Sequence, residues 1–261
     1  MIDLHCHILH GIDDGSKSME QSLEMARVFQ QAGYQQVVAT PHTVPGTTWM
    51  PAPATIRERV AELNQALRDQ GTQLTVLPGA EIALHPQVPE LLDDDMIQSL
   101  AETSFVLIEP PFQRLPLGWE QVFFELKSKG YTPLLAHAER CEQLTYKQEL
   151  FEELISIGIY LQVNWGSFLG YNGSKAKKTA RYLASKGYIH CLATDSHRPD
   201  KRHAGISLHA AADVEELIGP QNFDLLARKN PLRVLRDEPL VDMAAKEIKT
   251  EAKRRRRWAI F

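Results

Sequence analysis

The chain has 261 residues, of which 43% are hydrophobic and 24% are charged, and its formal net charge is -4 at pH 7. A chain of this length can bury one large core, so we expect a single domain. The slightly acidic balance argues against a general attraction to nucleic acid, and no apolar run approaches the roughly 18 residues of a membrane span.

Two further features of the composition bear on location. The short apolar start lacks the basic region and apolar core of a secretory signal, and the three cysteines are odd in number and unpatterned. Unpaired thiols fit a reducing compartment better than a disulfide framework does. We therefore expect a cytoplasmic protein.

Seven short apolar runs are candidate strands. They are rich in β-branched residues and do not alternate between apolar and polar positions, which is typical of strands buried on both faces of a parallel sheet. The runs cover residues 2–4, 36–40, 74–82, 104–109, 132–137, 158–164 and 189–195.

Helical periodicity follows these runs. In the first helix, Ser18 and Gln21 fit a capping pair, and the expected buried face comprises Met19, Leu23, Ala26 and Phe29 before Gly33. In the second, Thr55 and Glu58 match a capping box, Gly71 stands at the expected C-terminal cap, and the apolar face comprises Ile56, Val60, Leu63 and Leu67. The Pro-rich segment 41–55 is expected to be either a flap over a site or a long connection.

About seven β-then-α units predict right-handed crossovers and a parallel sheet, either open or closed into a barrel. Neither G-x-G-x-x-G nor G-x-x-x-x-G-K-[ST] follows any candidate strand. The nucleotide-binding versions of the open sheet are therefore disfavoured, and the barrel is favoured.

Residues with metal-binding side chains stand at the carboxyl ends of the candidate strands. Because these ends converge on one mouth of a parallel barrel, eight residues scattered in sequence are expected to form one cluster. They are His5, His7, His42, Glu81, Glu109, His137, Asp195 and His197. Any one alone would more often be structural, but their joint placement favours a metal centre. The other histidines, His10, His85, His190, His203 and His209, lack this placement.

The spacing of the ligands is also informative. On an extended segment both side chains of an H-x-H pair point the same way, so His5 and His7 can hold one ion while Cys6 faces away. Asp195 and His197 are expected to repeat this geometry. A mixed nitrogen and oxygen shell suits Mn, Fe or Zn better than Ca.

The ordered set of motifs resembles the PHP (polymerase and histidinol phosphatase) superfamily. The motifs are HCH at 5–7, TPH at 40–42, GAEI at 79–82, LLAHAER at 134–140 and ATDSH at 193–197. The longer string DLHCHILHGIDDGS and NPLRVL at 230–235 are similar to its bacterial protein-tyrosine phosphatases of capsule and exopolysaccharide synthesis. The resemblance spans roughly residues 1 to 240.

The resemblance implies a distorted (β/α)7 TIM-like barrel over 1–240 with three divalent metal ions, often Mn. Carried over by position, His5, His7, Glu81 and Asp195 would hold one ion and Glu81 would bridge to another, with the remaining ions completed by His42, Glu109, His137 and His197. Asp14 matches an acid that ligates or transfers protons. Arg140 matches a phosphate-binding arginine, and a second such arginine is expected at Arg198 or Arg202, of which we favour Arg202.

The function implied by the resemblance is hydrolysis of phosphotyrosine on a protein, a membrane-associated bacterial tyrosine autokinase, by direct attack of metal-activated water. The rival cysteine route requires C-x5-R, but the residues six positions after Cys6, Cys141 and Cys191 are Ile12, Lys147 and His197.

Three aromatic residues, Trp49, Phe112 and Trp165, either form an apolar rim for a phenyl ring or belong to the core. His10 and Asp13 have no role in this interpretation.

Three alternatives remain open from the sequence. A small-molecule phosphatase of the histidinol-phosphatase type would share the site and differ in its rim. An amidohydrolase would also use an H-x-H barrel, but no strand end carries the lysine that such enzymes add. A non-catalytic scaffold would use its metals only for stability.

The segment 241–261 departs from the family pattern. It contains AAKEIKTEAKRRRRWAIF, with four consecutive arginines before Trp258. We expect a basic C-terminal tail or extra helix, which either is solvated or contacts anionic lipid, the kinase or nucleic acid.

The lipid interpretation of the tail predicts that the intact protein sediments with anionic vesicles and that deletion of residues 249–261 abolishes this binding. Equal sedimentation of the intact and shortened proteins would exclude the lipid contact.

Overall fold

The computed structural model describes residues 1–200 and 204–244. The predicted phosphate-binding residue Arg202 and all of the predicted tail after residue 244 lie outside the described residues. Within the described ranges, no helix combines the length and the apolar character needed to cross a membrane.

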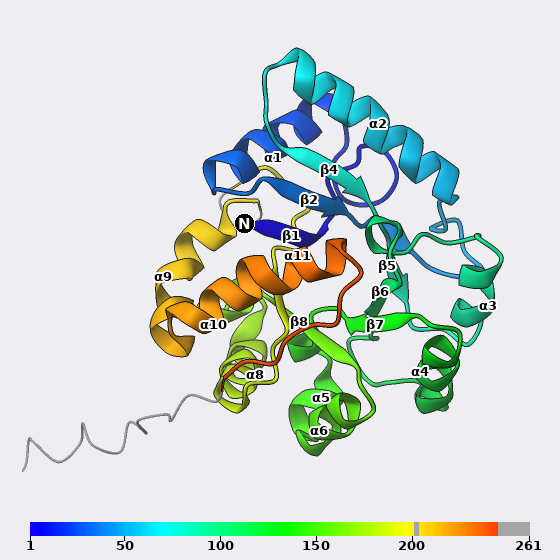
Figure 1. The fold of residues 1–261 in the computed structure, drawn as a ribbon, viewed down its shortest axis with the longest axis vertical. Helices are drawn as coiled ribbons and strands as arrows, with labels where there is room; N and C mark the ends of the chain where they lie inside the picture. The colour runs from blue at the N-terminus through cyan, green and yellow to red at the C-terminus, as the bar shows by residue number, and fades with distance from the viewer. Residues whose placement is uncertain (201–203, 245–261) are drawn as a thin grey trace, which may run out of the picture.

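Parallel strands form the centre of the molecule (Figure 1). Two hydrogen-bonded sets run in the orders β1-β2-β4 and β3-β5-β6-β7-β8-β9, and every pair is parallel. The strands are β1 (Ile2–Cys6), β2 (Gln36–Ala39), β3 (His42–Thr43), β4 (Thr75–Pro78), β5 (Glu81–Ala83), β6 (Phe105–Glu109), β7 (Thr132–Leu135), β8 (Tyr160–Asn164) and β9 (Cys191–Ala193).

One of the seven expected runs, 74–82, is divided into two strands, and an additional short strand follows the run 36–40. The chain leaves β2 after Ala39 and resumes pairing as β3, and β4 and β5 are divided in the same way around Gly79. The expected strand over 74–82 was therefore wrong in its continuity. The remaining runs form single strands, and the seven β-then-α units are confirmed.

Hydrogen bonds join the first strand to the last. The Asp195 N–H donates to the His5 carbonyl at 2.9 Å, and the His7 N–H donates to the Ser196 carbonyl at 2.8 Å. Below them the buried Asp3 carboxylate accepts from both the backbone N–H and the hydroxyl of Thr194. The sheet thus curls round until β1 and β9 meet, as the distorted (β/α)7 barrel predicts.

Most helices lie around the outside of the strands, whereas α11 lies across them in the view of Figure 1, contacts β1 and buries Val234 against strand residues such as Leu4. The helices are α1 (Met19–Gln31), α2 (Pro53–Asp69), α3 (Val88–Asp93), α4 (Trp119–Ser128), α5 (Glu142–Tyr146), α6 (Glu149–Ser156), α7 (Trp165–Leu169), α8 (Gly173–Lys186), α9 (Ile206–Ile218), α10 (Pro220–Asp224) and α11 (Asn230–Leu235). Short helical turns occupy Leu100–Glu102, Ala138–Arg140 and Leu225–Lys229.

The two predicted helix starts had different outcomes. Ser18 caps α1 by accepting the Gln21 N–H at 3.3 Å, as expected. The capping box at Thr55 was wrong, because α2 begins two residues earlier at Pro53, with Ala52 as its uncapped N-terminal residue. Proline fits the first helical position because its fixed φ is already helical and that position needs no N–H.

Apolar side chains fill the interior of the barrel away from the mouth. One buried cluster joins residues from five strands around the sheet, including Leu4, Val38, Leu107, Leu134 and Cys191. Strands on different sides of a closed sheet can contact one another only through its interior, so this cluster is the barrel core. A larger cluster packs the outer faces of the strands against the helices.

Gly79 lies at the division between β4 and β5, where a Cβ atom would stand 2.6 Å from Val38 Cγ1 and 3.2 Å from the Ala39 carbonyl oxygen. We predict that Gly79→Ala lowers the free energy of unfolding by about 1–3 kcal/mol through overpacking. Urea unfolding provides the measurement. Gly166→Ala is the control, since its Cβ would meet nothing closer than 3.7 Å; an equal loss in both variants would contradict the steric explanation.

Candidate metal centre

The eight predicted ligand residues gather at the carboxyl ends of the strands. His5 is the penultimate residue of β1 and His7 follows that strand, His42 and Glu81 are the first residues of β3 and β5, and Glu109 is the last residue of β6. The other three follow the last residues of their strands: His137 follows β7, and Asp195 and His197 follow β9. The structure therefore brings together residues from six positions around the barrel.

Glu81 is at the centre of this cluster and is fully buried. Its Oε1 lies 2.9 Å from His137 Nε2 and 3.2 Å from His5 Nε2. Its Oε2 lies 3.0 Å from His42 Nδ1 and 3.3 Å from His7 Nε2. One carboxylate thus contacts four imidazoles, with each oxygen between two rings.

The charges in the cluster shift several pKa values. Burial would raise the pKa of Glu81, but His5, His137 and His42 hold it well below its usual range. Burial would likewise lower the pKa of His5, and the carboxylates of Glu81 and Asp195 instead raise it to about 9. The pKa of His197 is lowered to about 4 by burial and by the neighbouring His7. The acidic and basic groups therefore stabilise one another's charged forms, except at His197 and at Glu109, whose pKa is raised by burial and by the neighbouring Glu81.

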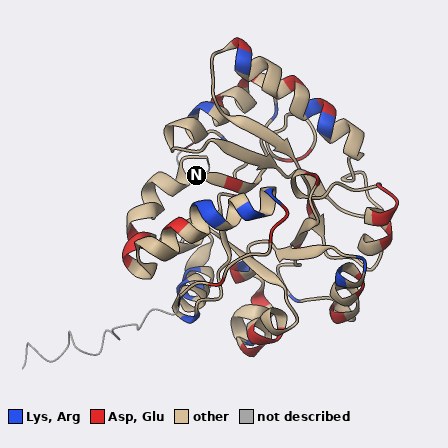
Figure 2. Ribbon diagram, in the orientation of Figure 1, with Lys and Arg blue, Asp and Glu red and all other residues tan. Residues whose placement is uncertain are grey.

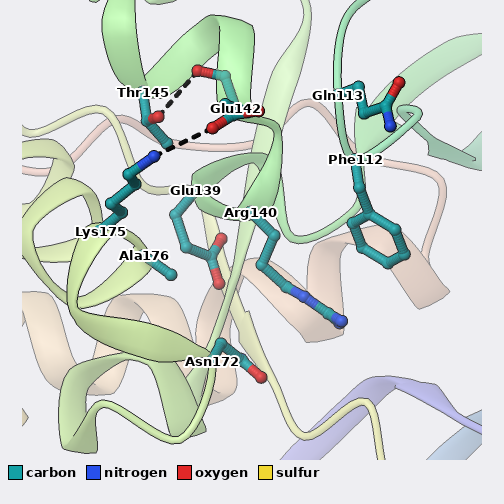
Figure 3. A pocket seen from close by; sticks show the side chains of 9 residues that line it. All are labelled: Phe112, Gln113, Glu139, Arg140, Glu142, Thr145, Asn172, Lys175 and Ala176. Atoms are coloured by element: carbon teal, nitrogen blue, oxygen red, sulfur yellow. Dashed lines mark hydrogen bonds and ion pairs between the residues drawn. The ribbon is translucent and has the colours of Figure 1, made fainter.

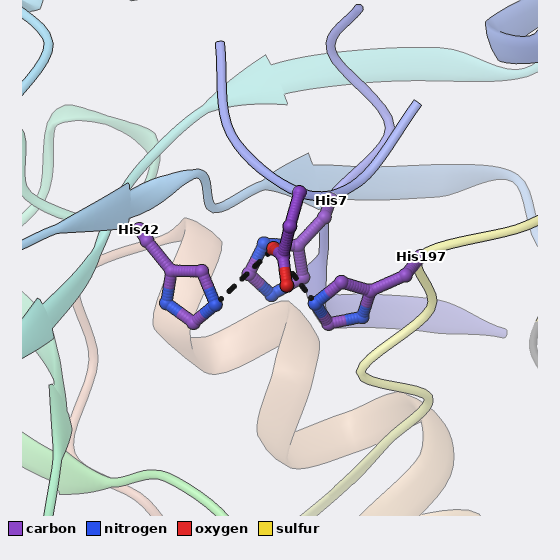
Figure 4. A group of neighbouring side chains, drawn as sticks. His7, His42 and His197 are labelled. Carbon is purple, nitrogen blue, oxygen red and sulfur yellow. Dashed lines mark ion pairs between the residues drawn. The ribbon is translucent and has the colours of Figure 1, made fainter. Parts of the chain in front are cut away.

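The donor atoms fall into four groups, and within each group they lie no more than 4.8 Å apart. The groups are His5 with His7 and Glu81; His5 with His137 and Asp195; His42 with Glu81 and Glu109; and His7 with Asp14, His42 and His197, the three histidines of which are shown in Figure 4. Shared members such as Glu81 link the groups into one centre.

The residues present fit divalent metal ions. Buried polar atoms normally have hydrogen-bond partners, yet His137 Nδ1 has none, and Glu81 Oε2 accepts no well-aligned hydrogen bond although His42 Nδ1 lies 3.0 Å away. The donor set contains imidazole nitrogens and carboxylate oxygens without thiolates, which matches the preferences of Mn, Fe and Zn.

Two of the clustered residues have unusual backbones. His137 has φ of 29° and Asp195 has φ of 53°, in a region that costs non-glycine residues roughly 1–3 kcal/mol. The expectation that Asp195 and His197 repeat the extended H-x-H geometry was therefore wrong, although His197 Nδ1 still lies 3.5 Å from Asp195 Oδ1. For His5 and His7 the expectation is confirmed, since their Nε2 atoms lie 3.3 Å apart while Cys6 Sγ is directed at the Val38 carbonyl.

Asp13, which had no role in the sequence interpretation, orients the cluster. Its Oδ2 lies 2.7 Å from His7 Nδ1 and accepts the backbone N–H of His42 at 3.1 Å, while its Oδ1 accepts the Gly15 N–H at 2.9 Å. Burial would raise the pKa of Asp13, but the bond to His7 lowers it to about 2. An ionised Asp13 fixes the proton of His7 on Nδ1 and leaves Nε2 free for a metal.

Gln162 and Asn164 play the same part on the opposite side and were also missed. Gln162 Oε1 lies 3.1 Å from His5 Nδ1 and accepts the His137 N–H at 3.0 Å. Asn164 Nδ2 donates to Asp195 Oδ2 at 2.9 Å. A sequence signal existed, because two amides alternate within the otherwise apolar strand β8.

Arg140 and Asp14 border the centre. Arg140 Nη1 donates to Asp195 Oδ2 at 2.7 Å, and its guanidinium stands over the Phe112 ring. Asp14 is half exposed, with Oδ1 3.5 Å from His42 Nε2 and 3.4 Å from His197 Nε2. Beside Arg140 a cavity of about 390 Å³ opens, with Phe112 and Lys175 among its lining residues (Figure 3).

The three cysteines are buried and free. Burial raises the pKa of each thiol, most of all at Cys6 and Cys191. A nucleophilic cysteine needs a lowered pKa and access to solvent, so none of them suits that role.

The sequence matches the model of the family Capsular polysaccharide synthesis, CpsB/CapC, over residues 1–236. It is 37% identical to the tyrosine-protein phosphatase YwqE of Bacillus subtilis over 203 residues, which cover 78% of this chain and 80% of YwqE. It is 28% identical to the tyrosine-protein phosphatase CpsB of Streptococcus pneumoniae over 247 residues, which cover 91% of this chain and 99% of CpsB.

Solved structures agree with these relationships. A crystal structure from work on YwqE and CpsB, described as unique metal-dependent tyrosine phosphatases, superimposes with a TM-score of 0.86 and 34% identity, covering 93% of this chain and 97% of that one. The zinc-containing histidinol phosphate phosphatase of Lactococcus lactis superimposes with a TM-score of 0.54 and 13% identity, covering 87% of this chain and 96% of that one. The second likeness shows a shared fold.

We predict that Asp13→Asn weakens metal binding by roughly 10–100-fold, because an amide cannot accept all three hydrogen bonds and no longer holds the His7 proton on Nδ1. Competition with a chromogenic chelator measures the affinity without relying on turnover. Asp94→Asn, at an exposed position, is the matched control. Equal metal affinity of Asp13→Asn and the wild-type protein would contradict the orienting role.

Proposed function

This chain belongs to the CpsB/CapC family of capsular polysaccharide synthesis, and we propose that it is a metal-dependent protein-tyrosine phosphatase. The observation that carries the proposal is the arrangement of nine histidine, aspartate and glutamate side chains in four linked groups beside Arg140. Because a phosphate monoester is dianionic and hydrolyses extremely slowly, a catalyst must concentrate positive charge on it.

The proposed cofactor is a set of three divalent ions, Mn in the first instance, with Fe or Zn as alternatives. His5, His7, Glu81 and Asp195 would hold one ion, and Glu81 would bridge to a second. Residues His42, Glu109, His137 and His197 would complete the other ions. When bound, the ions would neutralise phosphoryl charge and would supply a water of lowered pKa as the nucleophile.

The protein's own groups would complete the reaction. Arg140 is partly exposed, so its guanidinium can hold two phosphoryl oxygens as a fork. Asp14, exposed and next to His42 and His197, is placed to ligate an ion or to carry a proton to the departing tyrosine oxygen. The second phosphate-binding arginine remains a prediction from sequence at Arg202.

The proposed physiological substrate is phosphotyrosine on a membrane-associated tyrosine autokinase that controls capsule or exopolysaccharide synthesis. Support comes from the family and from relatives named tyrosine-protein phosphatases. Three free cysteines fit the cytoplasmic location that this substrate requires. Figure 2 shows basic and acidic residues interspersed on the outer helices, in keeping with a protein rather than a nucleic acid partner.

We predict that chelator treatment abolishes phosphate release from a phosphotyrosine peptide and that added Mn restores it. The variant Cys6→Ser/Cys141→Ser/Cys191→Ser is expected to keep metal-dependent turnover, because the buried thiols of the wild-type protein are not the nucleophile. Histidinol phosphate, assayed in parallel, tests the small-molecule alternative. A preference for histidinol phosphate would support the proposed active site but contradict the proposed substrate. Turnover that survives complete metal removal would contradict the metal-dependent mechanism.

A further inference from the structure

Two exposed aromatic side chains stand at the ends of a curved row of imidazole rings. Trp49 stacks on His42 with ring centroids 5.5 Å apart, and His42 continues to His7 at 4.5 Å. At the other end Phe112 stacks on His137 with centroids 5.7 Å apart. The histidines between them are those of the candidate metal centre, so the two aromatic rings flank that centre on either side.

The exposure of these rings distinguishes them from the other aromatic residue considered for the rim. Trp49 is 42% exposed and Phe112 is 50% exposed, whereas Trp165 is 1% exposed and belongs to the core. Of the two interpretations left open for Trp165, the core is therefore the one that the structure shows. Large apolar side chains that remain exposed beside a polar site are candidates for ligand contact.

Backbone hydrogen bonds hold both residues in place. The Trp49 carbonyl accepts the Val44 N–H, and the Trp49 N–H donates to Thr47 Oγ1 at 3.1 Å. The Phe112 carbonyl accepts the Glu142 N–H at 2.7 Å, which ties it to the start of α5. The backbone is thus fixed at both positions, and the two rings stack on His42 and His137, so little ordering is needed on binding.

Phe112 is also next to the proposed phosphate-binding group. The Arg140 guanidinium carbon lies 4.6 Å from the centroid of the Phe112 ring, and Figure 3 shows the two side chains adjacent. A phosphoryl group held by Arg140 would therefore place its ester substituent within reach of an aromatic surface. An aryl substituent gains ring contacts there that a short alkyl chain cannot make.

We propose that Trp49 and Phe112 form an aryl subsite that receives the phenyl ring of the substrate and selects aryl over alkyl phosphomonoesters. The inference rests on the proposed phosphatase function and adds to it the residues that decide the class of ester. The subsite acts through apolar and ring contacts, so it raises affinity for the ring without taking part in bond cleavage.

The experiment compares Trp49→Leu, Phe112→Leu and the double variant with the wild-type protein reconstituted with Mn. Phenyl phosphate and propyl phosphate are the substrates, and each variant is compared with wild type on the same substrate, which cancels the different leaving abilities of phenol and propanol. Inhibition by phenylphosphonate and by methylphosphonate reports binding without turnover. Phe124→Leu, on α4 and 66% exposed, is the matched control.

Each leucine substitution is expected to lower kcat/KM for phenyl phosphate, and the affinity for phenylphosphonate, by about tenfold while changing the propyl phosphate and methylphosphonate values by less than about twofold. Trp49→Phe and Phe112→Tyr keep a ring and are expected to restore the aryl preference. Metal content, measured in every variant, separates ring contact from an effect through His42 or His137.

The outcomes separate this inference from the function on which it rests. Equal losses on both ester classes would overturn the aryl subsite and assign the rings to positioning Arg140 or the metal ligands. Unchanged aryl preference in the double variant would also overturn it. Failure of the wild-type protein to hydrolyse a phosphotyrosine peptide or phenyl phosphate would overturn the proposed function itself, and the aryl subsite with it.

Discussion

The buried carboxylate of Glu81 is the interaction on which the rest of the site depends. Four imidazoles converge on its two oxygens, and the charge of His5 together with hydrogen bonds from His137 and His42 outweighs the large cost of burying an ionised group. The barrel reaches this arrangement by interrupting its own strands. The β4–β5 division at Gly79 directs Glu81 to the mouth, and the β2–β3 division does the same for His42.

Hydrogen-bonded polar side chains surround the proposed ligands and determine how each is presented. Asp13 holds His7 from one side, and Gln162 holds His5 from the other, so both rings present Nε2 to the centre. The closure between β1 and β9 carries the same ligands, because the backbone groups of His5 and His7 make the joining hydrogen bonds. Fold closure and ligand placement are therefore one set of interactions, and the left-handed backbone at Asp195 is sustained by that closure.

Most of the architecture could be predicted because its signals are local. Short apolar runs and helical periodicity give the order of the elements, and the carboxyl ends of parallel strands must meet at one mouth. The predictions of element boundaries were wrong where two local signals conflicted or where the packing of buried residues determined the boundary. Helix α2 begins at Pro53 rather than after a capping box at Thr55, and the predicted strand over 74–82 is interrupted where Gly79 packs against Val38. For Trp165 the sequence left rim and core open, and the packing of α7 against the core decides between them.

By itself, the sequence determined which metal-binding side chains exist and that they follow successive strands, since residue type and spacing specify both. Only the tertiary structure decided which donors share a group, that Asp13 and Gln162 orient His7 and His5, and that Trp49 and Phe112 stay exposed while Trp165 is buried. The physical reason is that these properties depend on contacts between segments far apart in the chain. Hydrogen-bond direction, burial and electrostatic balance exist only after the barrel has closed.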